Sequence, residues 1–295
     1  QVRDVLFTTA NRTDNGIGKA LFGSDGDKLD PKVPDEDYGW GVIDLGKAIY
    51  GPGQFFGTFD VAVKGDDVWH NSISDEAIQA RGEEDRTQMQ KYAKRIAELK
   101  ALEKLTDQQS WELEYKTKRL ASIKDREAQG WTGKLVKHGK GDLTLTAVNS
   151  YTGGTDVVEG KLAGMTESFG SAPVAVEDGA TLELHKSFTI VKAGQEGEVA
   201  VNSNGTDKVS DDAQVVLKKG AVLSLAANQL SLKSLSVQGP ATLDVRAANL
   251  PELTFTVDDD IQGIDHLKVV YDTNRYSGAK ITVDDETVKV NLTAK

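Results

Sequence analysis

A glycine-punctuated stretch, residues 133–162, restricts the folds open to this chain of 295 residues. Three Gly-x-Leu steps begin at Gly133, Gly141 and Gly160, and an alternating run extends from Leu143 to Ala147 before a polar turn. The alternation places leucines on one face and threonines on the other, as in a half-buried strand. Glycines at such offsets suit tight corners. The pattern predicts one coil of a stacked β-solenoid.

Later segments repeat this template less regularly. Each has a polar corner, a glycine and an alternating apolar strand, and they are Asp178–Leu184, Lys219–Leu225 and Gly239–Val245. The corners lie roughly 20 to 40 residues apart, which predicts loops on some rungs. A solenoid coil buries its inward face only by stacking on its neighbours. The final alternating segment, Ile281–Leu292, surrounds an acidic turn and predicts a hairpin that protects the last rung.

Residues 72–128 have a different character, with little glycine and many charges. Apolar and aromatic residues recur at helical steps, namely Met89, Tyr92, Ile96 and Leu99. Residues 106–109, Thr-Asp-Gln-Gln, have the form of a capping box that starts a second helix. This pattern predicts an antiparallel α-helical hairpin, closed by Gly130 and Trp131 and inserted between a first strand and the repeat coil.

The first segment of the chain combines short helical patterns with a long polar stretch. Apolar spacing predicts a helix within Gln1–Ala10, and residues 11–37 predict an irregular surface loop. Asp44 is placed to cap a short helix that ends near Ala48. Weak alternation over Phe55–Val63 predicts the first strand.

Composition excludes several classes of function. The net charge of −11 argues against binding to nucleic acid or to anionic membranes, and the lack of cysteine excludes disulfide and thiolate sites. No apolar run approaches the ~20 residues that a membrane-spanning helix needs. Because no signal peptide precedes the helical pattern, the chain is expected to be a mature or excised fragment.

The stretch at residues 133–162 also resembles the passenger-associated strand repeat of bacterial autotransporters. That pattern reads Gly-x-Leu, Lys-x-Gly-x-Gly-x-Leu-x-Leu, Asn-x-Tyr-x-Gly-x-Thr and again Gly-x-Leu, and nearly every position is met. In that family the motif belongs to a right-handed parallel β-helix exported to the surface of Gram-negative bacteria. The resemblance therefore implies the same fold and location for this chain.

A second resemblance covers the first fifty or so residues. Val-Arg-x-x-Leu-x-x-Thr-Ala, followed by Gly-Trp-Gly-x-Ile-Asp-x-Gly-Lys-Ala, is similar to the C-terminal end of a subtilisin-like catalytic domain. The catalytic Asp-Ser-Gly, His-Gly-Thr and Gly-Thr-Ser-Met-Ala motifs of that family do not occur here, so no triad residue is carried over. Residues 170–173, Gly-Ser-Ala-Pro, echo a nucleophile helix, but they lack the preceding Gly-Thr and lie in the repeat region.

These observations predict a mainly β chain, a right-handed parallel β-helix with an inserted antiparallel α-helical hairpin and a short α-containing protease remnant. The expected divisions are 1–52, the end of a subtilisin-like domain; 53–71, a linker and first strand; 72–131, the helical hairpin; and 132–295, the β-helical stalk. The predicted function is a non-catalytic stalk in the passenger of a secreted or surface-displayed serine endopeptidase of Gram-negative bacteria, a virulence factor. The chain alone should be inactive.

The resemblances imply an upstream subtilisin-like catalytic domain and a downstream β-barrel translocator as partners, with export through the outer membrane. A protein partner at the helical hairpin is a further expectation, and nucleic acid is not. No catalytic, cofactor-binding or metal-binding residue is predicted, and no cofactor is expected. Two alternatives stay open: an adhesin or partner-binding module that uses the hairpin, and a β-helical enzyme acting on polysaccharides.

Several side chains are of types that form sites, but their surroundings in the sequence fit simpler interpretations. The acidic groups could supply oxygen ligands to calcium, but their spacing favours solvated turns; they are Asp258–Asp260, Asp211–Asp212 and Asp284–Glu286. His70, beside Trp69, Asn71 and Asp67, fits packing at the start of the hairpin better than metal binding or catalysis. Tyr151 and Trp131 at coil corners fit core positions better than sugar platforms.

Overall fold

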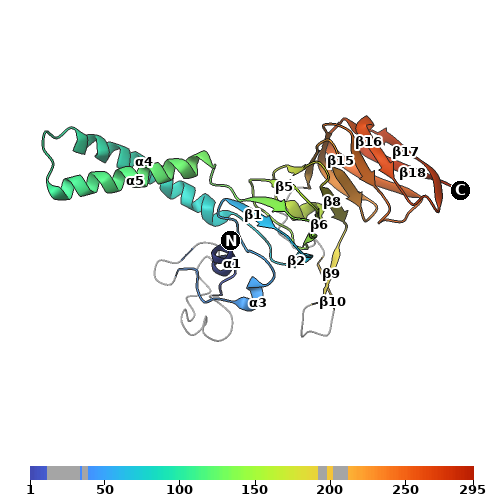
Figure 1. Ribbon diagram of the computed structural model, residues 1–295, viewed down its shortest axis with the longest axis horizontal. Coiled ribbons are helices and arrows are strands. Elements are labelled where there is room, and N and C mark those ends of the chain that lie inside the picture. The colour runs from blue at the N-terminus through green and yellow to red at the C-terminus, as the bar shows by residue number, and fades with distance from the viewer. Residues whose placement is uncertain (12–33, 35–38, 192–197, 202–211) are drawn as a thin grey trace.

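The computed structural model describes residues 1–11, 34, 39–191, 198–201 and 212–295. The loop predicted for residues 11–37 therefore lies almost entirely outside the described residues. Within them, the chain forms two large sheets, a small two-stranded sheet and two long helices that project to one side (Figure 1).

The larger sheet in the described part of the chain has nine strands. In spatial order they are β1 (Thr58–Ala62), β3 (Lys134–His138), β5 (Thr155–Val157), β7 (Val174–Val176), β11 (Gln214–Leu217), β13 (Leu230–Val237), β15 (Glu252–Gln262), β18 (Thr287–Ala294) and β17 (Tyr276–Asp284). The pairs from β1 to β15 are parallel, and β18 joins β15 and β17 in antiparallel fashion.

The second sheet contains seven described strands, all parallel. They are β16 (Leu267–Val270), β14 (Ala241–Asp244), β12 (Val222–Leu225), β8 (Thr181–His185), β6 (Lys161–Met165), β4 (Leu143–Leu145) and β2 (Asp67–Trp69). From β1 to β16, apart from β9 (Phe188–Val191) and β10 (Glu198–Val201), strands alternate between the two large sheets along the chain. Each pair of consecutive strands is therefore one coil.

The register confirms the repeat that the sequence predicts. Leu182 of β8 lies beside Leu223 of β12, which lies beside Leu243 of β14. The three weak copies of the template are thus neighbouring rungs of one sheet. The wider spacing between the first two copies accommodates β9 and β10, which pair with each other as an antiparallel hairpin. The mainly β, parallel, helix-like architecture is confirmed.

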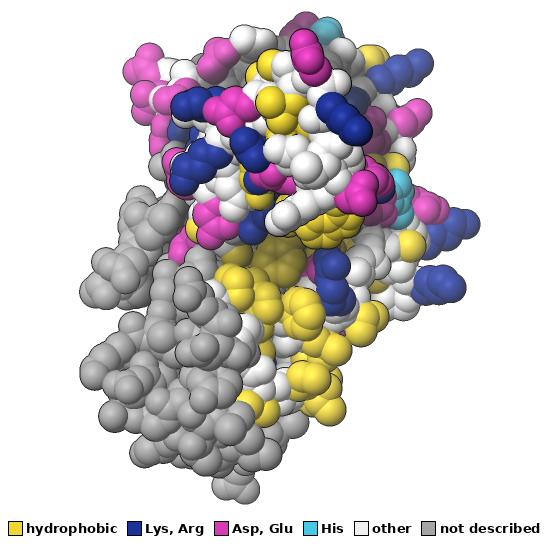
Figure 2. Space-filling view, turned by 90° about the vertical axis from the view of Figure 1, so that its left-hand side faces the viewer, with side chains coloured by type: hydrophobic (Ala, Val, Ile, Leu, Met, Phe, Trp, Pro, Cys, Tyr) yellow, Lys and Arg dark blue, Asp and Glu magenta, His cyan; other side chains and the backbone are white. Residues whose placement is uncertain are grey.

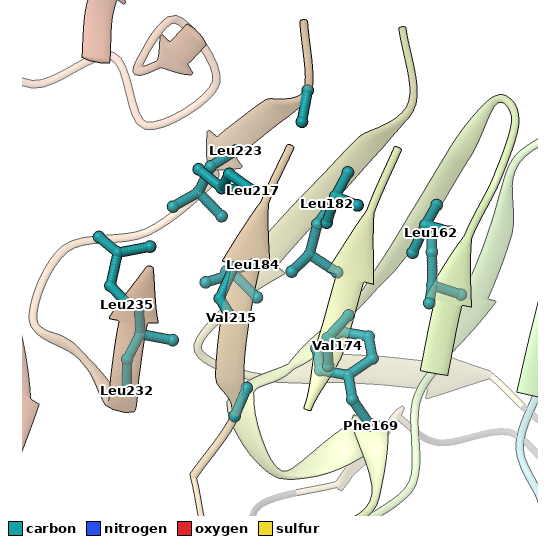
Figure 3. Close-up of a cluster of buried hydrophobic side chains, with 14 of the residues drawn as sticks. Leu162, Phe169, Val174, Leu182, Leu184, Val215, Leu217, Leu223, Leu232 and Leu235 are labelled. Atoms are coloured by element: carbon teal, nitrogen blue, oxygen red, sulfur yellow. The ribbon is translucent and has the colours of Figure 1, made fainter. Parts of the chain in front are cut away.

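The core runs between the two sheets along the solenoid. Leucine and valine side chains from successive rungs stack in rows there, as Figure 3 shows for Leu162, Leu182 and Leu223, and these three are fully buried. Burial of a leucine contributes about 1.5–3 kcal/mol relative to exposure. Because each rung is covered only by its neighbours, this stabilisation accumulates along the stack.

The sheets begin inside the segment 53–71, which the sequence assigned to a linker and first strand. β1 pairs with β3, and β2 pairs with β4, both in parallel. At the other end, the predicted hairpin is present as β17 and β18. It extends the nine-stranded sheet alone, so it protects one of the two sheets and leaves β16 at the edge of the other.

Two helices separate β2 from β3: α4 (Glu76–Lys100) and α5 (Asp107–Ala128). The predicted capping box is present, since Thr106 and Gln109 each bond the other's backbone N–H. The helices lie side by side and extend away from the sheets (Figure 1). Ile96, Leu99 and Ile123 are their buried apolar side chains, so their contact surface is largely polar.

Two short helices lie near the first rung: α1 (Val2–Thr8) and α3 (Leu45–Ala48). The Asp44 side chain accepts a hydrogen bond from Lys47 N, as its predicted capping role requires. Neither helix contributes a buried residue. Among the described helices, none combines the length and the hydrophobicity required to cross a membrane.

Candidate functional site: polar networks across the rungs

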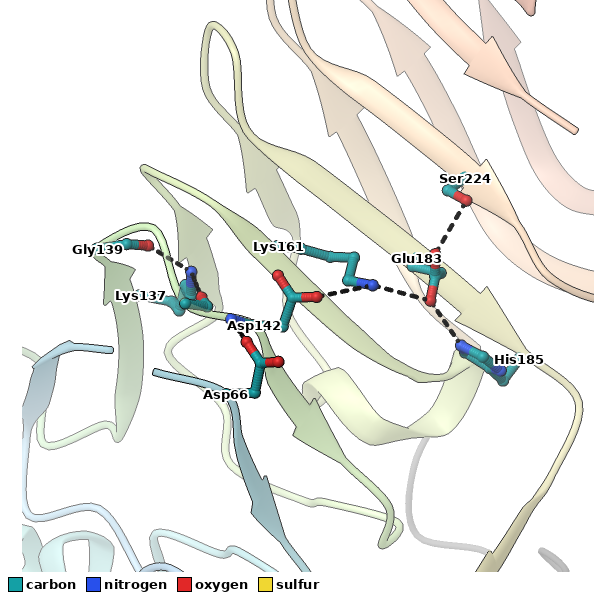
Figure 4. A network of polar contacts seen from close by, with 9 residues as sticks. Asp66, Lys137, Gly139, Asp142, Lys161, Glu183, His185 and Ser224 are labelled. Carbon is teal, nitrogen blue, oxygen red and sulfur yellow. Dashed lines mark hydrogen bonds and ion pairs between the residues drawn. The ribbon is translucent and has the colours of Figure 1, made fainter. Parts of the chain in front are cut away.

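A polar network crosses the outer face of the seven-stranded sheet (Figure 4). Lys161 of β6 lies 2.9 Å from Asp142 and 3.5 Å from Glu183 of β8. Glu183 also pairs with His185 at 3.0 Å and accepts a hydrogen bond from Ser224 of β12 at 3.2 Å. The strand alternation explains this arrangement, because Leu182 and Leu184 point into the core and Glu183 points outward.

The electrostatics of this network keep the side chain of Glu183 ionised near neutral pH. The hydrogen bond from His185 is the main cause that lowers the pKa of Glu183 from 4.5 to about 2, and the charge of Lys161 adds to it. A group with such a pKa cannot act as a general acid near neutral pH. The hydroxyl of Ser224 bonds to the carboxylate and not to the imidazole, and it is 5% exposed. The network therefore joins β6, β8 and β12 and has no nucleophile–base pair.

A second network surrounds the side chain of Lys137, which points into the corner between two coils. Its Nζ donates to the carbonyl oxygens of Gly139, Gly141 and Glu159 at 2.6–2.7 Å. The side chain is fully buried, and burial lowers the pKa of Lys137. Lys137 thus supplies the hydrogen-bond donor for three carbonyl groups on two successive turns of the solenoid. Without it, these carbonyl groups would need water as a donor.

The polar turn after β4 forms a third network, centred on Asn149. Its Oδ1 accepts from Ile73 N at 2.7 Å, and its Nδ2 donates to Ser168 O at 2.6 Å. One side chain therefore links three successive coils. Tyr151 beside it is fully buried and bonds Thr155 at 2.6 Å, and burial raises the pKa of the Tyr151 hydroxyl.

The base of α4 is held by two buried carboxylates. Asp75 Oδ2 accepts from Gly133 N at 2.8 Å and from both N and Oγ1 of Thr152. Asp85 pairs through both oxygens with Arg126 of α5, at 2.6 and 2.8 Å, and accepts from Trp131 Nε1 at 3.1 Å. Burial raises the pKa of Asp85, but the hydrogen bonds from Arg126 and Trp131 and the charges of Arg126 and Arg81 together outweigh it, so that this pKa is lowered.

His70, Trp69 and Trp131 occupy packing positions. His70 Nδ1 lies 2.8 Å from Thr146 Oγ1, and its ring contacts that of Tyr50 in a tilted arrangement, with the centroids 5.0 Å apart. Trp69 is buried and donates to Asp67 at 3.0 Å. Trp131 is 6% exposed and packs against α4.

The acidic groups do not converge. Residues 258–260 are exposed on β15, and residues 284–286 lie at the end of β17 and in the turn before β18. Asp211 lies outside the described residues, while Asp212 accepts from Thr166 Oγ1 at 3.1 Å. In the described part of the chain, no three histidine or acidic side chains gather as metal ligands would. Gly170 has a φ of 76°, and the segment after it leads into β7.

Comparison with known proteins gives two matches. Residues 135–163 match the passenger-associated-transport-repeat family, over the part of the chain that holds the Lys137 and Asn149 networks. The repeat implies an autotransporter passenger region. A stretch of 74 residues, 25% of this chain, is 39% identical to serotype-specific antigen 1 of Mannheimia haemolytica. That stretch spans 6% of the relative's length.

Passenger regions are displayed or secreted, so the repeat indicates a surface-exposed or secreted protein. The matched repeat contains Lys137 and Asn149. Both side chains bond backbone groups at the corners of neighbouring coils. Sequence reasoning missed Lys137, Asn149, Asp75 and Asp85 as anchors. The contact between Glu183 and His185 could have been predicted, because residues two apart on an alternating strand lie on the same face.

Proposed function

We propose that this passenger fragment is a non-catalytic, right-handed β-helical stalk that carries a subtilisin-like serine endopeptidase domain at its N-terminal end. In this proposal residues 1–52 complete the protease domain, 53–71 lead into the stalk, 72–131 are an inserted α-helical hairpin and 132–295 are the stalk. The protease would hydrolyse peptide bonds by a Ser-His-Asp mechanism with residues outside this chain. Export would follow the outer-membrane route through a β-barrel translocator.

The observation that carries the proposal is an exposed apolar surface on and beside α1 and α3, which the described residues leave uncovered. Val2, Ile43, Leu45 and Ile49 are 60–75% exposed, and Phe7 is 42% exposed. Hydrophobic side chains gather in this part of the molecule below the charged helical pair, as Figure 2 shows. Short helices with apolar side chains and no buried residue are typical of a fragment of a larger core.

The same end of the molecule has a cavity of about 380 Å³ beside this surface. Val2, Val5 and Ile49 line one side, and Phe59 and Trp69 of the first rung line the other. A domain that covered α1 and α3 would therefore also rest on the first rung. The contact would set the position of the protease relative to the stalk.

Charge reversal on this surface tests the proposal. Ile49→Glu in a longer protein that includes the segment before Gln1 should release the protease domain from residues 1–52, and limited proteolysis should then cut between them faster. Val283→Glu is the matched control, since Val283 is an exposed valine at the far end of the molecule. Equal cleavage of the two variants would contradict the contact.

A partner-binding role for the helical pair is the second candidate. Trp111 and Tyr115 of α5 are 68% and 46% exposed, and their rings stack 5.8 Å apart. Exposed aromatic pairs are common in protein-binding surfaces. Trp111→Ala with Tyr115→Ala should abolish attachment to host cells if this role is correct. Unchanged attachment would exclude it.

A further inference from the structure

A row of four side chains runs along the outer side of α5. The residues lie four apart, so each is about one helical turn from the next, and they are Asp107, Trp111, Tyr115 and Arg119. The two aromatic rings at the centre stack on each other and are 68% and 46% exposed. These four residues are called the α5 row below.

The charged residues at the two ends of the α5 row have no partner within the described part of the chain. No described residue forms an ion pair or a hydrogen bond with the side chain of Asp107 or Arg119, and the Nε of Arg119 is buried without an acceptor. By contrast, Glu114 beside the row pairs with Lys118 at 2.6 Å. The row therefore ends in one unpaired carboxylate and one unpaired guanidinium.

The α5 row is complementary to itself when a second copy lies antiparallel to it. Asp107 of each copy then faces Arg119 of the other, and Trp111 faces Tyr115. A parallel arrangement would instead bring like charges together. Contacts between one surface and its own copy about a two-fold axis are the commonest kind in protein dimers. Tryptophan, tyrosine and arginine are also the residue types that contribute most to binding at protein interfaces.

The position and charge of the helical pair allow two copies to approach. α4 and α5 project away from both sheets (Figure 1), so the sheets of two copies would lie at opposite ends of the paired helices. Residues 76–128 contain eleven acidic and twelve basic side chains, whereas the whole chain has a net charge of −11. The contact would thus lie where the net charge is close to zero and repulsion between copies is small.

We propose that this chain forms a two-fold symmetric dimer through antiparallel contact of two α5 rows. Each dimer contains two ion pairs between Asp107 and Arg119, on either side of four aromatic rings. Because the contact is small, the association is weak and depends on concentration. The inference rests on the partner-binding role proposed for the helical pair, for which it names a second copy as the partner, and it is independent of the stalk and protease roles.

Sedimentation velocity of the chain of residues 1–295, over a roughly hundredfold range of concentration, tests the proposal. We expect a monomer–dimer equilibrium. Arg119→Glu and Asp107→Arg should each weaken it by about tenfold or more at low ionic strength, because the symmetry turns both ion pairs into like-charge contacts at once. Lys124→Glu is the matched control, since Lys124 is exposed on the opposite side of α5. Its reversal should change the equilibrium by less than about threefold.

A mixture of the two charge-reversal variants separates a specific contact from a folding defect. When Asp107→Arg meets Arg119→Glu, each end of one row faces an opposite charge on the other. We expect the mixture to associate within about threefold of the unchanged chain, although each variant alone associates weakly. Circular dichroism of each variant checks that its helix content is retained.

Three outcomes would overturn the proposal. They are a monomer at every concentration, equal association of the unchanged chain and Arg119→Glu, and failure of the mixture to associate. The second outcome would place the contact on another surface. If the chain stays monomeric but Trp111→Ala with Tyr115→Ala abolishes attachment to host cells, the partner-binding role stands and only a second copy is excluded as the partner.

Discussion

At the scale of single residues, buried polar side chains connect backbone segments from different coils. Lys137 bonds three carbonyls, and Asn149 spans three coils with its two amide atoms. A solenoid has few contacts between distant parts of the chain, so such bonds are a main means of fixing the register of one coil on the next.

Removal of Lys137 should destabilise the solenoid strongly. Lys137→Met leaves the carbonyls of Gly139, Gly141 and Glu159 buried without a donor, at a cost of roughly 2–4 kcal/mol in the free energy of unfolding. Urea denaturation measures this change. Lys140→Met is the control, because Lys140 is an exposed lysine in the same corner. A difference between the variants below about 0.5 kcal/mol would contradict the role of Lys137.

The network around Glu183 predicts a pH dependence. Its pKa of about 2 in the folded protein lies below the ordinary 4.5, so its contribution to stability is present above pH 4.5 and is lost as the pH falls towards 2. We expect Glu183→Gln to remove about 2 kcal/mol of this dependence, after allowance for partial exposure. Glu252→Gln, at an exposed position of β15, should leave the profile unchanged. Identical profiles for both variants would disprove the assignment.

At the scale of elements, the helical pair leaves and rejoins the solenoid at one point. Asp75 and Gly133 are hydrogen-bonded to each other, although α4 and α5 lie between them in sequence. Asp85 then ties α4 to α5 and to Trp131. The pair is therefore anchored at its base and polar along its length.

Loss of the Asp85 anchor should loosen the helical pair without unfolding the sheets. Asp85→Asn weakens the paired contact with Arg126, so amide hydrogen exchange in α4 and α5 should become faster. Exchange in β6 and β8 should not change. Glu114→Gln is the control, since Glu114 forms an exposed ion pair within α5. Slow exchange in α4 and α5 of the Asp85→Asn variant would show that other contacts hold the pair.

Sequence reasoning predicted the strands better than the contacts between coils. Leu182, Leu223 and Leu243 could be aligned from their glycine corners, because an alternating strand has only one face to bury. The partners of Lys137 and Asp75 could not be predicted, since they depend on which coils stack. The final hairpin was predicted as a cap, but alternation does not show which of two sheets it extends.

At the scale of the whole molecule, the solenoid should depend on its last rungs and not on its helices. Deletion of residues 239–295 removes β14 to β18 and uncovers Leu223 and Leu235, so we expect aggregation or loss of cooperative unfolding. Replacement of residues 76–132 by a short Gly/Ser linker should leave the sheets folded, because the ends of the deleted segment are adjacent. Circular dichroism with thermal unfolding measures the folding of both variants. Soluble, cooperative folding of the 239–295 deletion would contradict the dependence on the last rungs, and loss of cooperative unfolding in the linker variant would contradict the independence from the helices.

The two ends of the molecule differ in a way that suits a stalk. The N-terminal end exposes apolar side chains on α1 and α3. The other end is acidic, and there the hairpin of β17 and β18 covers the edge of the nine-stranded sheet. A covering domain at the first end would leave the polar outer faces of the sheets exposed to solvent.

Labelling with a serine-reactive phosphonate is the most direct test of the proposed function. The chain of residues 1–295 and a longer protein extended before Gln1 are treated in parallel and compared on a gel. We expect the longer protein alone to be labelled, because the nucleophile would lie in the added segment. Labelling of residues 1–295 alone would mean that this chain contains a nucleophile, and absence of label from both would contradict a protease carried on this stalk.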